Sequence, residues 1–119
     1  MSLEEKYVEK AEILFNEAIE DMNIACYNKA VSAFYFSVEA LANALLAKCN
    51  QRVRGFRGRI NIVAALVSEE IAKDMSRLYE LRVLADHKET LVGKQTVYEA
   101  FEIAKKIYAK LKQHIEEER

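Results

Sequence analysis

The chain of 119 residues contains no proline and only three glycines, and this scarcity limits the folds open to it. Tight turns depend on these two residue types, because proline presets one backbone dihedral and glycine tolerates a positive φ. A β-rich fold built on short hairpins is therefore nearly excluded. The composition predicts long helices joined by few connections.

Apolar residues recur at alternating steps of four and three, which is the spacing of one helical face. This stripe is widest in the second predicted helix, whose composition is apolar enough for the centre of a bundle. We therefore predict an all-α, up-and-down bundle of four long helices and one short helix, forming a single domain over residues 1–119. The helices are expected at 2–21, 25–49, 60–67 (the short one), 69–87 and from 97 onward.

Capping residues mark three of the predicted helix starts. Ser2 and Glu5 have the spacing of a capping box, in which each side chain bonds the other residue's backbone N–H. Ser68 is suited to cap the fourth helix. Thr96 and Glu99 repeat the capping-box spacing and predict the start of the last helix.

The formal net charge is −1, so no global charge attracts the chain to nucleic acid or to an anionic membrane. No run approaches the roughly 18 apolar residues that a spanning helix needs. The opening residues Ser2, Glu4 and Glu5 differ from the basic start of a signal peptide. We expect a cytoplasmic protein with no membrane partner.

Cysteine and histidine are too few and too scattered for a metal site or a disulfide framework. Cys26 and Cys49 are 23 residues apart, or about 34 Å on a single helix, which is too far for a disulfide within the chain. Together with His87 and His114 they show none of the spacings of a zinc site. No phosphate-binding glycine motif is present either. No metal and no cofactor is expected.

Positive charge is concentrated in the predicted loop at 50–59, which carries four arginines and no acidic residue. Residues 1–49 carry four lysines and eight acidic residues, so the contrast along the chain is strong. Either the loop binds phosphates or a nucleotide, or it is a solvated loop, and the sequence leaves both readings open. The four candidates are Arg52, Arg54, Arg57 and Arg59.

The second predicted helix also carries a narrow polar ridge that includes Glu39, the only acidic residue between Asp21 and Glu69. Glu39 is a candidate acidic partner for Arg82, across the bundle or across a dimer axis. The more favoured reading is a structural ion pair between helices, or simple exposure. The ridge consists of Asn28, Ser32, Tyr35, Glu39 and Asn43.

Arg82 and His87, near the end of the fourth predicted helix, form the strongest candidate for chemistry. Five residues advance an ideal helix by about 500°, so the two side chains point about 140° apart. Arg82 and Asp86 are true neighbours, four residues apart, and predict an ion pair. Taken alone, this pattern is also consistent with a surface ion pair beside a solvated histidine.

The Arg82–His87 pattern, together with the segment from Tyr27 to Phe36 and the arginine-bearing connection, resembles the HEPN domain family. The resemblance covers roughly residues 5–115 and is strongest to small stand-alone prokaryotic and archaeal members. It implies a helical bundle and a symmetric homodimer. Many members are metal-independent endoribonucleases, including toxins of toxin–antitoxin pairs, in which Arg-x4-6-His motifs of two subunits meet at the dimer interface.

The resemblance gives Arg82 and His87 catalytic roles on RNA, with Asp86 and Glu39 in support. Neutral imidazole can take the proton of the RNA 2′-hydroxyl, and arginine can hold the phosphate. Two positions depart from the active family pattern, namely Val83 after the arginine and Glu89 two residues after the histidine. The alternative is a non-catalytic subunit that binds a nucleotide or acts with a minimal nucleotidyltransferase, as other HEPN proteins do.

Overall fold

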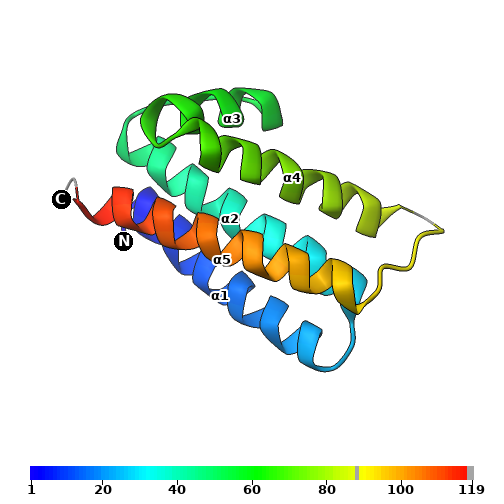
Figure 1. Ribbon diagram of the computed structural model, residues 1–119. Helices are drawn as coiled ribbons and strands as arrows, with labels where there is room; N and C mark the ends of the chain where they lie inside the picture. The colour runs from blue at the N-terminus through cyan, green and yellow to red at the C-terminus, as the bar shows by residue number, and fades with distance from the viewer. Residues whose placement is uncertain (88, 118–119) are drawn as a thin grey trace.

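The computed structural model describes residues 1–87 and 89–117, and in these residues it contains five helices and no strand (Figure 1). The predicted all-α fold with four long helices and one short helix is confirmed. The helices are α1 (Leu3–Asn23), α2 (Tyr27–Lys48), α3 (Gly55–Leu66), α4 (Glu69–Asp86) and α5 (Lys94–Glu117).

Helix α2 is the central element of the bundle. Figure 1 shows α1 on one side of it, α3 and α4 on the other, and α5 running alongside. Its side chains Val31, Phe34, Val38 and Leu41 are completely buried, and each such burial contributes roughly 1.5–3 kcal/mol. Phe34 also packs edge-on against Phe15 of α1, with ring centroids 5.4 Å apart. The continuous apolar stripe of α2 therefore forms the core that positions the other helices.

Two of the three predicted helix caps are confirmed. Ser2 Oγ accepts from the backbone N of Glu5 at 3.1 Å, and Glu5 Oε1 accepts from the backbone N of Ser2 at 3.2 Å, which completes the capping box. Ser68 Oγ accepts from the backbone N of Ile71 at 3.1 Å. The predicted cap at Thr96 is wrong, because α5 begins at Lys94 and Thr96 therefore lies inside its first turn.

The segment 50–59 was predicted to be a loop, and this is correct only for its first part. Helix α3 begins at Gly55, five residues before the predicted start. The local signal was misleading because Gly55 and Gly58 both favour irregular backbone. Gly55 does have φ of 76°, a left-handed value that suits the entry to the helix. Arg57 and Arg59 consequently lie on a helix.

Helix α2 also corrects the expectation about apolar runs. By length and composition, Tyr27–Lys48 could cross a membrane, with a mean hydropathy of 1.5 in its most apolar window. However, 67% of that window is buried inside the bundle. The other helices of the bundle therefore cover most of this apolar window.

Candidate active site

The polar ridge of α2 faces the candidate residues of α3 and α4. Its five members, spaced by three and four residues, lie along one strip of the helix. Their contacts extend from the end of α4, through the middle of α4, to α3. We call this strip the α2 ridge; it consists of Asn28, Ser32, Tyr35, Glu39 and Asn43.

Arg82 lies against the middle of the α2 ridge, where it is fixed from several sides. Its Nε lies 3.0 Å from Asp86 Oδ2, which confirms the ion pair predicted from their spacing. Its guanidinium carbon lies 5.9, 5.1 and 5.8 Å from the ring centroids of Tyr35, Phe36 and Tyr79. Arginine over aromatic faces is held by cation–π attraction as well as by charge. About 28% of the Arg82 side chain remains exposed, so its outer edge is accessible to a ligand.

Asp86 connects Arg82 to the α2 ridge. One carboxylate oxygen, Oδ2, pairs with Arg82, and the other, Oδ1, accepts a hydrogen bond from Ser32 Oγ. A carboxylate with both oxygens engaged has little rotational freedom. Asp86 is therefore suited to orient Arg82, as the sequence hypothesis of a supporting role requires.

His87 ends α4 and is exposed. Its extended backbone turns the chain out of the helix, so its ring is not held on the helical face of Arg82. The ring atom Nδ1 lies 3.3 Å from Thr90 Oγ1. This contact leaves Nε2 pointing away from the Thr90 hydroxyl, and an exposed ring nitrogen is the group that a proton-transfer role requires.

Asn28 was placed on the ridge by the sequence, but its role was not predicted. It bonds three backbone groups that are 57 to 64 residues away in the sequence. Its Nδ2 donates to the carbonyl oxygens of Ala85 at 2.6 Å and Thr90 at 2.8 Å, and its Oδ1 accepts from Val92 N at 3.2 Å. Only the tertiary fold brings these groups together, so the polar spacing on α2 was the one available signal.

Glu39 pairs with Arg59 of α3 rather than with Arg82. Arg59 Nη1 lies 3.6 Å from Glu39 Oε2, and Arg59 Nε donates to Asn43 Oδ1 at 2.9 Å. Within one chain, this contact agrees with the interpretation favoured from the sequence, which was a structural ion pair between helices. Arg59 is also largely covered, with 14% of its side chain exposed.

The hydroxyl of Tyr35 lies within this polar group. Burial, followed by the charge of Glu39, raises the pKa of the phenol well above its ordinary value. Tyr35 therefore stays neutral across the physiological range. Its ring packs against Tyr79 at 5.5 Å between centroids, and Tyr79 stacks on Phe56 of α3 at 4.0 Å. Tyr35 and Tyr79 thus belong to the aromatic cluster over which Arg82 lies, and Phe56 supports Tyr79.

The four arginines of the 50–59 segment do not act as one group. Arg52 and Arg54 line an open cleft with a volume of about 1030 Å³ between the start of α1 and the end of α2. Arg57 and Arg59, two residues apart on α3, point about 160° apart, and Arg59 turns inward to the α2 ridge. The predicted phosphate-binding set is therefore divided among three places.

Among residues 1–87 and 89–117, no group of three or more histidine, cysteine, aspartate or glutamate side chains is arranged to hold a metal ion. Cys26 and Cys49 flank α2 at its two ends, and both are free thiols. The groups that the site offers for chemistry are the positioned guanidinium of Arg82, the Asp86 carboxylate and the exposed imidazole of His87.

Comparison with known proteins agrees with this architecture. The family model of the HEPN domain matches residues 4–114 of the 119-residue chain. A search of curated proteins found no match. The matched region begins within α1, ends within α5 and includes the whole α2 ridge. The chain thus belongs to the HEPN domain family.

Proposed function

We propose that this protein is a metal-independent endoribonuclease that acts as a homodimer in the cytoplasm. The observation that carries the proposal is the exposed imidazole of His87, one residue after the Asp86 carboxylate that fixes Arg82. HEPN domains are often ribonucleases or nucleotide-binding modules, so the family supports this class of activity. A role as the toxin of a toxin–antitoxin pair would fit such an enzyme.

The proposed chemistry needs no group beyond the protein and the RNA. Neutral His87 takes the proton of the 2′-hydroxyl, whose oxygen then forms a bond to the adjacent phosphorus. The bond from phosphorus to the 5′-oxygen breaks, and a protonated His87 of the second protomer gives that oxygen its proton. Arg82 stabilises the charge that develops on the phosphate oxygens. The products are a 2′,3′-cyclic phosphate and a free 5′-hydroxyl.

The homodimer supplies the second His87 that the proposed reaction needs. A single protomer offers one His87, whose ring leaves the helix away from Arg82. A two-fold axis along this end of α4 brings two copies of each residue around one cleft. The exposed outer surface of α4 beside Arg82 is apolar at Val83 and Leu84, each 45% exposed, which favours contact with a second protomer.

A second candidate function rests on a different observation. Arg82 is already engaged by Asp86 and three aromatic rings, and Val83 follows it where active relatives carry a polar residue. Arg52 and Arg54, by contrast, line an open cleft. In this alternative, the protein is a non-catalytic subunit that binds the phosphates of a nucleotide in the cleft and works with a minimal nucleotidyltransferase.

An RNA cleavage assay in excess EDTA separates the two functions. We expect wild type to cut single-stranded RNA, and Arg82→Ala and His87→Ala to lose at least about 10²–10³-fold in rate, the usual loss for an acid–base or charge-stabilising group. His114→Ala, on α5, is the matched control and should cut like wild type. Circular dichroism and dimer mass confirm that each variant is folded.

An inert wild-type protein, or variants that cut as fast as wild type, would exclude catalysis by Arg82 and His87. Nucleotide binding measured by calorimetry, with Arg52→Ala and Arg54→Ala as the weakened variants, would then support the second function. Binding that these two substitutions leave unchanged would exclude the cleft as well.

A further inference from the structure

His87 lies in the connection between α4 and α5. A single side chain of α2 is hydrogen-bonded to backbone groups on both sides of His87 in the sequence. Asn28 donates to the carbonyl of Ala85, in the last turn of α4, and to the carbonyl of Thr90, beyond His87. It also accepts from the backbone N of Val92, just before α5. These three bonds join the end of one helix to the approach of the next across the position of His87.

An amide is the side chain that matches this set of backbone groups. It offers two donors and one acceptor oxygen, and here both kinds are used against two carbonyls and one N–H. A carboxylate of the same shape would face the two carbonyls with an acceptor only. An apolar side chain would leave all three backbone groups without this partner, at a cost for each buried group.

The surrounding contacts extend the effect of Asn28 to the imidazole. Thr90, whose carbonyl Asn28 holds, also donates its backbone N–H to the His87 carbonyl at 3.1 Å. The Thr90 hydroxyl lies 3.3 Å from His87 Nδ1. Val92, whose N–H bonds Asn28, is buried with 8% exposure and anchors the connection in the core. The position of the His87 ring is therefore set through Thr90 by a side chain on another helix.

We propose that Asn28 is a positioning residue for His87: it holds the α4–α5 connection so that Thr90 fixes Nδ1 and directs Nε2 outward. The proposal rests on the proposed ribonuclease function for its catalytic consequence. For a proton to leave the 2′-hydroxyl, Nε2 must be the free acceptor, so Nδ1–H donates to the Thr90 hydroxyl in the competent state. Asn28 itself touches no substrate, and its role passes entirely through Thr90 and the backbone.

A purely structural role for Asn28 would have different consequences. Asn28 would then close the end of α4 and contribute to stability, while His87 kept its place. The two roles separate in the turnover rate and in the environment of the ring, which a loss of stability alone does not change in the folded protein.

The test uses two substitutions at Asn28 that differ in charge, Asn28→Asp and Asn28→Leu. An effect common to both comes from the lost donors and not from a new charge. Asn61→Asp and Asn61→Leu, at an exposed position on α3, are the matched controls. Thr90→Val is a third variant that removes only the hydroxyl beside the ring and leaves the helices untouched.

Two measurements are made on each variant. NMR of the free protein at a fixed pH reports the ring signals of His87 and the hydrogen exchange of the Val92 amide. Steady-state cleavage of single-stranded RNA reports kcat and KM separately.

For both Asn28 variants we expect moved ring signals, faster exchange at Val92, a fall in kcat of at least about tenfold and a nearly unchanged KM. Displacement of a reacting group by about 1 Å costs on the order of 10²-fold in rate, so tenfold is a modest expectation. Thr90→Val should give the same pattern with a smaller loss, and the Asn61 variants should match wild type.

The proposal and the ribonuclease function can fail separately. Unmoved ring signals in the Asn28 variants would overturn the proposal whether or not the protein cuts RNA. Moved signals with an unchanged kcat would also overturn it. If wild type is inert, the ribonuclease function fails, and the NMR data alone decide whether Asn28 holds His87. If the Asn28 variants do not fold, unchanged signals and kcat in Thr90→Val would overturn the proposal.

Discussion

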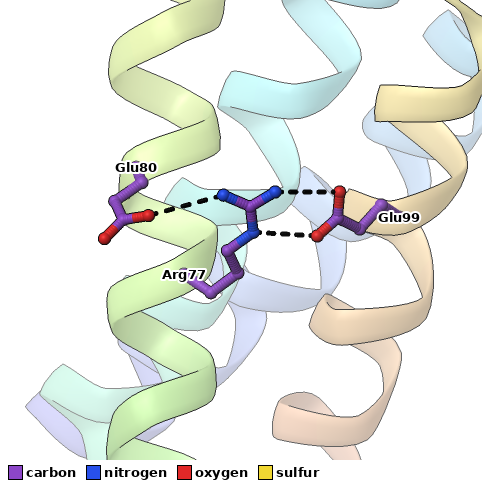
Figure 2. A network of polar contacts seen from close by, with 3 residues as sticks. All are labelled: Arg77, Glu80 and Glu99. Atoms are coloured by element: carbon purple, nitrogen blue, oxygen red, sulfur yellow. Dashed lines mark hydrogen bonds and ion pairs between the residues drawn. The ribbon is translucent and has the colours of Figure 1, made fainter.

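Helix α4 meets α2 and α5 in different ways. On the side of α2, the polar groups are partly covered. Asn28 of α2 donates to backbone carbonyls at and just beyond the end of α4, and Arg82 of α4 lies over aromatic rings. On the side of α5, exposed ion pairs cross the surface. Arg77 donates to Glu99 twice, from Nε to Oε2 at 2.8 Å and from Nη2 to Oε1 at 3.2 Å, and once to Glu80 at 3.4 Å. Figure 2 shows this network. We call the contacts of α2 with α3 and α4 the α2 seam, and the ion pairs between α4 and α5 the α4–α5 seam.

Because exposure to water weakens an ion pair, the two seams should also differ in how much their ion pairs stabilise the fold. The side chains of Arg77 and Glu99 are 48% and 41% exposed, whereas those of Arg59 and Glu39 beside the α2 ridge are 14% and 28% exposed. Water screens the first pair, and exposed pairs contribute about 0–1 kcal/mol. Polar groups with less water around them depend more on their protein partners. The Arg59–Glu39 pair of the α2 seam is therefore harder to replace than the exposed Arg77–Glu99 pair of the α4–α5 seam.

Removal of one of the aromatic rings that Arg82 lies over should have the largest effect on the free energy of unfolding. Tyr35 is 1% exposed, so Tyr35→Ala should lower the free energy of unfolding by about 3 kcal/mol, the lower end for removal of a buried aromatic side chain. Tyr98→Ala, on the exposed surface of α5, should change it by less than about 0.5 kcal/mol. Urea unfolding followed by circular dichroism measures both.

Equal losses in the two tyrosine variants would contradict the contrast between a buried seam and a solvated surface. Tyr35→Phe sharpens the test, because it keeps the ring and removes only the hydroxyl beside Glu39. It should retain most of the stability that Tyr35→Ala loses.

The sequence was sufficient for the fold because the fold depends on local patterns. The apolar stripe of α2 and the caps at Ser2 and Ser68 each act over a few residues, and each was predicted correctly. The start of α3 was missed because Gly55 and Gly58 resemble a loop when considered locally. Thr96 was misread for a similar reason: the capping-box spacing was present, but the helix had already begun.

The candidate site was only partly predictable. The ion pair of Arg82 with Asp86 follows from helical spacing alone. The partners of Asn28 and Glu39 lie on other helices, so no local pattern could assign them, although their spacing on α2 marked them as one strip. The division of the four arginines among a cleft, an outer face and the α2 ridge likewise requires the path of α3.

A change of charge on each seam should give an effect of intermediate size. Glu39→Gln leaves the largely covered Arg59 without its carboxylate and should destabilise the fold by roughly 1 kcal/mol, between the values for exposed and buried pairs. Glu99→Gln should cost only a few tenths of that amount, and 0.5 M salt should reduce the small loss further. Chemical unfolding at two salt concentrations compares the variants. A larger loss from Glu99→Gln than from Glu39→Gln would reverse the proposed order of the seams.

The smallest expected effect is a dependence on pH at the exposed seam. Lys106 lies 2.8 Å from Glu70 and 2.9 Å from Asp74, and its hydrogen bond and charge hold the pKa of Glu70 below the ordinary value of 4.5. Because the pKa of Glu70 is lower in the folded protein than in the unfolded chain, the ion pair stabilises the fold fully at pH values above the pKa of the unfolded chain. The contribution disappears as the pH falls through the folded pKa. Lys106→Met should therefore flatten the fall in stability between about pH 5 and pH 3.

The loss of stability caused by Glu39→Gln should be the same with Lys106 and with Met at position 106. Thermal melts across this pH range measure the slopes. An unchanged slope in Lys106→Met would mean that water already screens this ion pair completely, and that the pair contributes nothing to the stability of the α4–α5 seam.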